Sequence, residues 1–389
     1  MNSLLTELTA RLQSLDDTAL RRTRRLATTP CGPLATIDGR TMLAFASNDY
    51  LGLAGDAALA AAARDGATRW GVGAGASHLV SGHTDAHEQL ERRLAAFVGM
   101  DAALSFSTGY MANIAVMPAL LSRGDEIFAD RLNHASLIDG AQLARATLRR
   151  YAHGDMDALA QRLANSDAPR KLIVTDSVFS MDGDVAPLAR LLALAEAHDA
   201  WLLVDDAHGF GVLGPQGRGA LAEAGLRAER LILMGTLGKA AGVAGAFVAG
   251  HRVLIDWLLN SARAYIFTTA APPMLAHTLL TALDTIEQGD ARRAHLNALI
   301  AHFQAHLHLT RWRAQPSRTA IQPVLIGDNA TALRAARALY EEGIWVPAIR
   351  PPTVPVGTAR LRISLTAAHT FEHVDRLIDA LRRCEASQA

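Results

Sequence analysis

The chain has 389 residues, of which half are apolar and a fifth charged, and its 38 basic residues balance its 38 acidic ones. These proportions exclude a disordered chain, and the zero net charge creates no overall field that would attract nucleic acid or an anionic membrane. Two cysteines are too few for a disulfide framework or a zinc cluster, and no metal site is expected. No run approaches the roughly 20 apolar residues that span a bilayer, and the first residues lack the pattern of a secretion signal. We therefore expect a soluble, cytoplasmic protein.

The predicted elements begin with an amphipathic helix over the first 25 residues, where leucines recur at helical spacing. A strand, a turn at Asp38-Gly39 and a second strand follow over residues 34–45. From about residue 56 to 285, short apolar runs alternate with helical patterns, which predicts a mostly parallel sheet covered on both faces. The expected strands are 103–106, 126–129, 172–175, 201–204, 231–234 and 246–249, and the expected helices include 57–70, 85–98, 109–121 and 187–198.

Beyond residue 273 the pattern changes to a mixture of strands and helices that is typical of a small α+β domain. A long helical region at 273–308 precedes expected strands at 320–326, 343–349 and 359–365 and helices at 329–342 and 369–383. We therefore expect an N-terminal helix and strand segment over 1–45, a large α/β domain over 46–288 and a small α+β domain over 289–389. A cleft between the domains is the default ligand site.

Two short motifs suggest other chemistry, but their surroundings do not support it. Gly71–Ala76 follows the pattern G-x-G-x-x-A, yet the residues before it look helical, whereas a dinucleotide site needs a preceding strand. His83 and His87 could share one face of a helix, but no Glu follows His83 as in the zinc motif H-E-x-x-H. A pair of polar histidines at a helix end is the better interpretation.

Side chains that can carry chemistry follow three of the expected strands, at the carboxyl ends where open α/β sheets bind their ligands. The strand 201–204 continues into Asp205, Asp206 and His208, and the strand 231–234 continues into Thr236 and Lys239. Of the two adjacent acids, one is expected to serve only the turn at the strand end. The third strand, 172–175, continues into two serines, Ser177 and Ser180.

The chain has only two lysines, and just one of them lies at a strand end. Lys171 precedes a strand and is expected to be a solvated charge, whereas Lys239 lies in a strand-end turn. Pyridoxal phosphate condenses with a lysine amine and needs a carboxylate at its ring nitrogen. Its phosphate needs hydroxyls and backbone N–H groups at the start of a helix, which residues 107–110 offer. The combination therefore predicts a pyridoxal 5'-phosphate enzyme.

The same motifs resemble those of the α-oxoamine synthases, which are fold-type-I pyridoxal phosphate enzymes. The resemblance covers the chain from about residue 19 to 381 and rests on D-D-A-H-G-x-G-V-L-G from Asp205, T-x-G-K at 236–239, S-N-D-Y-L-G-L at 47–53 and F-S-M-D-G-D at 179–184. It implies a fold-type-I transferase with a large domain, whose mostly parallel sheet lies between helices, and a smaller α+β C-terminal domain. The implied reaction joins an amino acid to an acyl thioester with loss of carbon dioxide.

One further stretch, A-I-R-P-P-T-V-P at 348–355, favours a member of the family that uses L-alanine and a pimeloyl thioester in biotin biosynthesis. The carrier of the thioester is either coenzyme A or an acyl-carrier protein. The nearest alternative is a glycine-using member, 2-amino-3-ketobutyrate ligase or 5-aminolevulinate synthase. More distant alternatives are a plain aminotransferase and a non-catalytic protein that senses pyridoxal phosphate.

The resemblance also implies roles for individual residues. Lys239 would bond to the cofactor aldehyde and later move the substrate Cα proton, Asp205 would pair with the ring nitrogen, and His134 would stack on the ring. These three are the implied catalytic residues. The other implied cofactor ligands are Gly109, Tyr110, Ser180, His208 and Thr236, and the implied substrate ligands are Arg21, Asn48, His134, Arg350, Thr353 and Arg362.

The family forms homodimers with the active site at the subunit interface. The resemblance therefore implies that residues 71–82 and 268–269 serve the partner's site. The chain departs from the family at two places: Asp176 stands where the family often has Glu, and Tyr265 and Phe267 lie where related enzymes have a tyrosine.

Overall fold

The computed structural model describes residues 3–388 and divides the chain into two compact units. Unit 1 combines the N-terminal residues up to Tyr50, the short segment Met181–Asp184 and the chain from Ala294 onward. Unit 2 combines Leu51–Ser180 and Val185–Arg293. The domain boundaries expected at residues 45 and 288 stay predictions.

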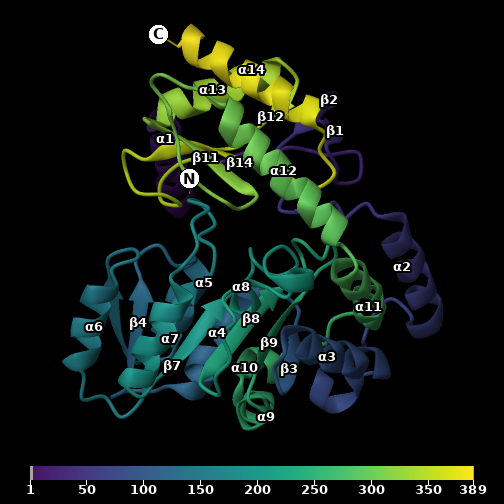
Figure 1. The fold of residues 1–389 in the computed structure, drawn as a ribbon, viewed down its shortest axis with the longest axis vertical. Helices are drawn as coiled ribbons and strands as arrows, with labels where there is room; N and C mark the ends of the chain where they lie inside the picture. The colour runs from purple at the N-terminus through teal and green to yellow at the C-terminus, as the bar shows by residue number, and fades with distance from the viewer. Residues whose placement is uncertain (1–2, 389) are drawn as a thin grey trace. The chain divides into compact units, whose positions relative to one another are not determined.

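A seven-stranded sheet in the order β3-β9-β8-β7-β6-β4-β5 forms the centre of unit 2 (Figure 1). The strands from β8 to β5 in this order are parallel, and β9 runs antiparallel to both β8 and β3. β6, β7 and β8 are buried along almost their whole lengths because helices cover both faces. The predicted mostly parallel sheet is confirmed. The strands are β3 Ala102–Phe106, β4 Glu126–Asp130, β5 Thr147–Tyr151, β6 Lys171–Asp176, β7 Ala200–Asp205, β8 Leu231–Thr236 and β9 Ala246–Gly250.

The helices of unit 2 begin and end at residues suited to those positions. Thr108 caps α4 by accepting the Met111 N–H at 3.1 Å, and Asp155 caps α6 in the same way. Gly99 ends α3 in the left-handed region that favours glycine. These helices are α2 Ala57–Trp70, η1 His78–Gly82, α3 Asp85–Val98, α4 Gly109–Leu120, α5 Ala135–Leu143, α6 Met156–Ala164, α7 Leu188–Ala197, η2 Pro215–Gly217, α8 Ala220–Glu223, α9 Arg252–Ser261, α10 Arg263–Ile266 and α11 Pro273–Glu287.

Unit 1 contains two smaller sheets and long helices. The four-stranded sheet β10-β11-β14-β13 is antiparallel, and the three-stranded sheet has the order β1-β2-β12. Thr370 caps α14, which buries one apolar face against the unit. The elements are α1 Ser3–Asp17, β1 Leu34–Ile37, β2 Arg40–Ala44, α12 Asp290–His306 (from Ala294 onward), β10 Arg313–Ala314, β11 Ile321–Gly327, α13 Asn329–Glu341, β12 Ile344–Trp345, β13 Ala348–Ile349, β14 Ala359–Ser364 and α14 Phe371–Ser387.

Several expected elements differ in detail from the observed ones. The first helix ends at Asp17, and the helical region expected at 273–308 is two helices separated at Gln288 and Gly289. The strand expected at 343–349 is two short strands, β12 and β13, which belong to different sheets. The glycine-rich segment 71–76 follows helix α2, so it lacks the strand that a dinucleotide site needs. Within residues 3–388, no helix has the length and apolar composition needed to cross a membrane.

Candidate active site

The carboxyl ends of three neighbouring parallel strands, β6, β7 and β8, bring the predicted strand-end residues together in unit 2. Asp176 and Asp205 are direct partners across β6 and β7, and Asp205 is level with Met234 of β8. Thr236 ends β8, and Lys239 lies in the turn beyond it. The Nζ atom of Lys239 is 2.9 Å from Nε2 of His208. An amine, an imidazole and buried carboxyl groups therefore gather at one edge of the sheet.

Asp205 is held by two neutral donors in a buried position. Its Oδ2 accepts a hydrogen bond from Nδ2 of Asn113 at 2.8 Å, and its Oδ1 accepts the Ala207 N–H at 3.0 Å. Asn113 also donates to the Ser136 hydroxyl at 2.9 Å, so α4 and α5 both support the carboxylate. Because neither donor carries charge, the position suits a cationic ligand atom.

Sequence reasoning missed Asn113. No motif marks this residue, which lies within an otherwise apolar helix and is fully buried. A buried amide usually has a specific hydrogen-bond partner. The polar residue inside the run G-Y-M-A-N-I-A-V-M was therefore the one signal that could have led to it.

His134 and Asp176 form a second polar pair at this edge. His134 caps α5, its Nδ1 lies 2.7 Å from the Ser136 hydroxyl, and its backbone N–H donates to Oδ2 of Asp176 at 2.8 Å. Burial lowers the pKa of His134, and the negative charge of Asp205 opposes this effect. Burial, with a further contribution from Asp205, raises the pKa of Asp176 well above its usual range. These shifts favour a neutral imidazole and a protonated Asp176.

The first turn of α4 lies beside the end of β8. A Cβ atom added to Gly109 would be 3.6 Å from Cε of Met234 and 3.9 Å from Cβ of Thr236. The Thr236 hydroxyl donates to the Gly245 carbonyl at 3.1 Å, while the half-exposed Tyr110 donates its hydroxyl to Asp139. A helix N-terminus next to a threonine hydroxyl is suited to a phosphate group.

Ser180 lies in the turn after β6, within unit 2, and is partly buried. The structure thus places all the predicted cofactor residues in one unit: Gly109, Tyr110, His134, Ser180, Asp205, His208, Thr236 and Lys239.

The predicted substrate residues Asn48 and Arg362 lie together in unit 1. The guanidinium of Arg362 is buried and donates to the Ser364 hydroxyl at 2.8 Å and to the Tyr50 hydroxyl at 3.4 Å. The Tyr50 hydroxyl in turn donates to Oδ1 of Asn48 at 3.2 Å. This chain of hydrogen bonds fixes the orientation of a planar cationic group that can bind a carboxylate through two hydrogen bonds.

Two other predicted substrate residues lie around a small cavity of about 60 Å³ in unit 1. Arg350 and Thr353 line it together with Arg22, whose guanidinium is 3.5 Å from the Thr353 hydroxyl. Arg350 donates to the backbone carbonyls of Ala19 and Arg21, whereas the Arg21 side chain contacts Asp16 at 3.4 Å. Burial, with the nearby charge of Arg22, lowers the pKa of Arg350.

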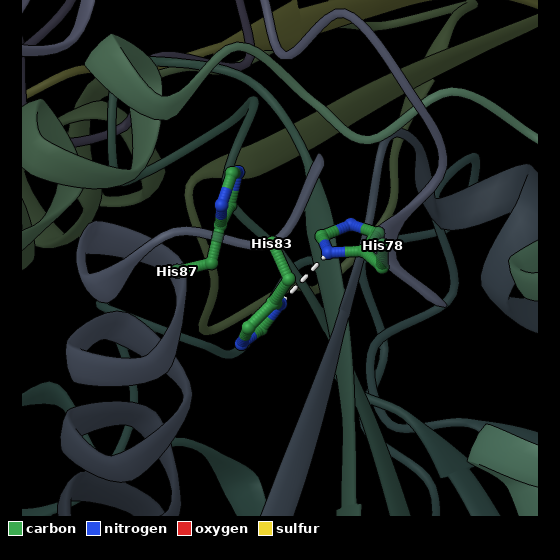
Figure 2. A group of neighbouring side chains, drawn as sticks. All are labelled: His78, His83 and His87. Atoms are coloured by element: carbon green, nitrogen blue, oxygen red, sulfur yellow. Dashed lines mark hydrogen bonds between the residues drawn. The ribbon is translucent and has the colours of Figure 1, made fainter. Parts of the chain in front are cut away.

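Three histidines cluster in unit 2 around the start of α3 (Figure 2). Nδ1 of His78 is 2.9 Å from Nδ1 of His83, and burial lowers the pKa of His78 to about 3. His87 accepts the Thr84 N–H on Nδ1, and its Nε2 contacts the Ala271 carbonyl at 2.8 Å. Both ring nitrogens of His87 are therefore occupied by the protein. This arrangement fits the interpretation of histidines at a helix end.

Comparison with known proteins agrees with the fold described above. Residues 40–381 match the family model of aminotransferase class I and II. A serine palmitoyltransferase structure from Sphingomonas wittichii, 31% identical, superposes with a TM-score of 0.92 over 99% of this chain and 98% of that one. The fold is that of the fold-type-I transferases, as the sequence predicted.

Closer relatives specify the family. The 8-amino-7-oxononanoate synthase of Aromatoleum aromaticum is 68% identical over 99% of this chain and the whole of the relative. That of Azoarcus sp. strain BH72 is 65% identical over 99% of both chains. A solved 8-amino-7-oxononanoate synthase from Francisella tularensis is 33% identical, with a TM-score of 0.76 over 89% of this chain and 98% of that one. The chain belongs to the 8-amino-7-oxononanoate synthase family, and the resemblance inferred from its motifs is confirmed.

Proposed function

We propose that this chain is a pyridoxal phosphate-dependent C-acyltransferase of biotin biosynthesis. It condenses L-alanine with a pimeloyl thioester and releases 8-amino-7-oxononanoate, carbon dioxide and the free thiol carrier. Relatives at 65–68% identity over nearly their full lengths carry the name of this activity. The structural observation that carries the proposal is the Lys239 amine, 2.9 Å from His208, at the sheet edge where Asp205 is buried.

The residues at this edge fit pyridoxal phosphate. Lys239 can bond to the cofactor aldehyde, and the buried carboxylate of Asp205 can pair with the protonated ring nitrogen. The N-terminus of α4, starting at Gly109, and the Thr236 hydroxyl are suited to the phosphate. When bound, the cofactor supplies an electron sink for the charge that develops at the substrate Cα. A solved serine palmitoyltransferase of similar fold, with a TM-score of 0.91, contains this cofactor.

The proposed chemistry of the chain's own residues centres on one proton. The Nζ atom of Lys239 removes it from Cα of the amino acid and later returns a proton there. His208 orients that amine through the 2.9 Å contact between Nε2 and Nζ. His134, whose pKa is lowered mainly by burial, presents a neutral ring to the cofactor face. Asp205 keeps its orientation because Asn113 and Ala207 hold both of its oxygens.

Substrate binding is assigned to the residues of unit 1 that the resemblance implies. Arg362 is proposed to bind the carboxylate of alanine, assisted by Asn48. Its guanidinium is already oriented by the hydroxyls of Ser364 and Tyr50, so little conformational entropy is lost on binding. Arg21, Arg350 and Thr353 are proposed to contact the acyl substrate or product.

A homodimer is proposed as the active form. Large exposed apolar side chains occur in and next to the segments expected to face the partner: Val72 is 76% exposed, Val80 79% and Phe267 71%. A partner subunit that covers these segments would remove such apolar side chains from water. Sedimentation analysis of the purified protein tests the dimer, and a Val80→Asp substitution is expected to shift it toward the monomer.

The reaction is tested by incubating the purified holoenzyme with alanine and either pimeloyl-CoA or a pimeloyl-acyl-carrier protein. Mass analysis should detect 8-amino-7-oxononanoate, and carbon dioxide should be released in equal amount. Glycine in place of alanine distinguishes the glycine-using synthases, and release of carbon dioxide distinguishes a plain aminotransferase. Absence of product with both carriers would contradict the proposed function, and Lys239→Ala provides the inactive control.

A further inference from the structure

Asp206 directly follows Asp205 at the end of β7, but its side chain has different partners. It is 1% exposed, its Oδ1 accepts the Ser177 hydroxyl at 2.5 Å, and its Oδ2 accepts the Ala220 N–H at 3.0 Å. Asp205 is held instead by Asn113 and the Ala207 N–H, so the two carboxylates share no hydrogen-bond partner. None of the roles proposed above uses Asp206.

Two glycines show how closely the backbone passes over this carboxylate. A Cβ atom on Gly209 would lie 2.2 Å from Oδ1 of Asp206, and one on Gly219 would lie 2.0 Å from Oδ2. Gly219 also has φ +98°, in the left-handed region that favours glycine. The two ends of the segment 206–220 therefore close around a single carboxylate.

The remainder of this segment is closed by its own backbone. The N–H groups of Gly209 and Phe210 donate to the Asp206 carbonyl at 3.1 and 2.8 Å. Further along, the Gly219 N–H donates to the Leu213 carbonyl at 2.9 Å. Segment 206–220 is thus a compact loop of the Ω type, whose ends are close together.

His208 lies inside this loop, between Asp206 and Gly209. Its Nε2 atom is 2.9 Å from Nζ of Lys239, which lies on a separate turn after β8. The path of the loop past the Asp206 carboxylate therefore determines where the imidazole meets the amine. A shift of about 1 Å in such a group is enough to reduce a rate by about 100-fold.

We propose that Asp206 is a positioning residue that closes the 206–220 loop and thereby fixes His208 against Lys239. The proposal rests on the proposed function in so far as Lys239 holds the cofactor. Asp206 itself touches neither the cofactor nor the substrate in this scheme.

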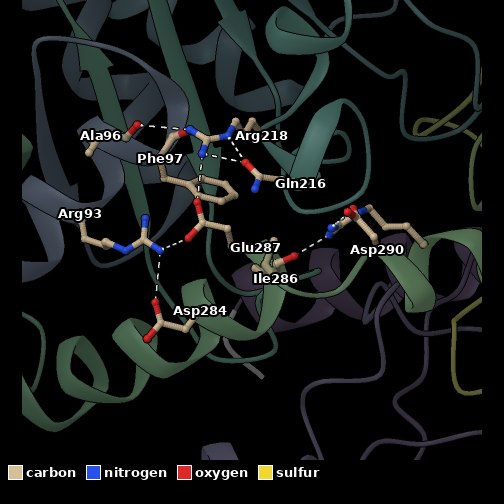
Figure 3. A network of polar contacts seen from close by, with 10 residues as sticks. Arg93, Ala96, Phe97, Gln216, Arg218, Asp284, Ile286, Glu287 and Asp290 are labelled. Carbon is tan, nitrogen blue, oxygen red and sulfur yellow. Dashed lines mark hydrogen bonds and ion pairs between the residues drawn. The ribbon is translucent and has the colours of Figure 1, made fainter.

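A second set of contacts holds the outer side of the same loop and supplies a matched control. Arg218 donates to the Phe97 carbonyl at 2.8 Å and to Glu287 at 2.9 Å, and Glu287 also contacts Arg93 at 2.5 Å (Figure 3). The side chain of Arg218 is 31% exposed, so water can replace part of its contacts. An Arg218→Gln substitution therefore removes part of these outer contacts and leaves both hydrogen bonds of Asp206 in place.

The test compares Asp206→Ala, Asp206→Asn and Arg218→Gln holoenzymes. The first readout is the pH midpoint of the visible absorbance of cofactor bound to Lys239, and the second is the split between kcat and the KM for alanine. Asp206→Ala should shift the midpoint and lower kcat by about 10- to 100-fold. Asp206→Asn should stay close to wild type in the absorbance midpoint and in kcat, because its amide can accept from the Ala220 N–H and donate to the Ser177 hydroxyl.

Arg218→Gln should lower the melting temperature and leave the midpoint unchanged. The proposal is overturned if Asp206→Ala keeps the wild-type absorbance midpoint and kcat. It is also overturned if Arg218→Gln, at an equal loss of melting temperature, shifts the absorbance midpoint as far as Asp206→Ala does. Should Asp206→Ala fail to fold, Ser177→Ala removes only one of the two hydrogen bonds. It must then give a smaller shift in the same direction, and an unchanged midpoint in Ser177→Ala counts against the proposal.

The absorbance titration also tests the role of Asp206 independently of the proposed acyl-transfer reaction. It needs only the cofactor and Lys239, and Lys239→Ala shows that the signal comes from that residue. Wild-type protein that shows the signal but forms no product with alanine and either pimeloyl thioester refutes the reaction, while the midpoint comparison still decides the role of Asp206. Wild-type protein without the signal refutes both, because there is then no bond at Lys239 for the loop to position.

Discussion

Replacing Asp206 with asparagine should change how the stability of the protein depends on pH. Burial raises the pKa of Asp206 to about 7, with Asp205 and Glu223 adding to the increase while Ser177 and Ala220 oppose it. In the unfolded chain an aspartate has a pKa of about 3.9. Between these values the folded protein keeps the proton and the unfolded chain releases it. The stabilising contribution of protonated Asp206 is therefore complete below about pH 4 and is lost as the pH rises through 7.

The size of this effect follows from the difference between the two pKa values. The increase from the ordinary value of 3.8 to about 7 is roughly 3 units, and each unit corresponds to about 1.4 kcal/mol. Wild-type protein should thus lose roughly 4 kcal/mol of unfolding free energy between pH 4 and 7 through this one group. Asparagine cannot ionise, so its unfolding free energy does not change through this position. The unfolding free energy of Asp206→Asn relative to wild type should therefore rise by this amount between pH 4 and 7 and stay constant above pH 7.

Urea unfolding of the cofactor-free proteins at several pH values measures this difference, because cofactor binding then adds nothing to the folded state. The other titrating groups are common to both proteins and cancel in the comparison. Asp157→Asn, at a side chain that is 92% exposed, controls for the effect of an Asp-to-Asn exchange at the surface. A difference between Asp206→Asn and wild type that stays constant from pH 4 to 8 would refute the reasoning.

Four further substitutions test the site, and absorbance, calorimetry and product analysis check them. Lys239→Ala should abolish both the absorbance of lysine-bound cofactor and turnover, whereas full turnover would contradict the proposed scheme. Asp205→Asn should leave a bound cofactor with a large loss of rate, because the ring nitrogen loses its carboxylate. Asn113→Ala should weaken cofactor binding, since Asp205 then keeps only the backbone donor. Gly140→Ala should destabilise the fold by about 1–3 kcal/mol and reduce activity, because its Cβ would lie 2.6 Å from the Asn113 carbonyl oxygen.

The central strands could be predicted from the sequence, whereas an edge strand could not. β6, β7 and β8 are continuous apolar runs because both faces of the sheet are covered, and such runs are visible in a single sequence. β5 has the sequence T-L-R-R-Y, and three of its five residues are exposed. Its place in the sheet depends on pairing with β4, which local composition does not reveal.

Part of the site could be predicted for a similar reason. Lys239 is one of two lysines, and it follows an apolar strand, so its position at the sheet edge could be inferred from residues close by in the sequence. Asn113 meets Asp205 across 92 residues of sequence, and it becomes recognisable only when the fold brings α4 to the residue that ends β7. Contacts of this range depend on tertiary packing and not on any local pattern.

The pair Asp205 and Asp206 shows where sequence reasoning reached its limit. The sequence indicates that one of two adjacent acids serves the turn, and the resemblance assigns the ring nitrogen to Asp205. The physical reason for the division lies in the different partners of the two side chains. Asn113 and the Ala207 N–H hold Asp205, whereas Asp206 faces the two glycines whose backbones cover it. Gly209 and Gly219 therefore act together with Asp206 in closing the 206–220 loop. A larger residue at either position should displace His208 as surely as loss of the carboxylate does.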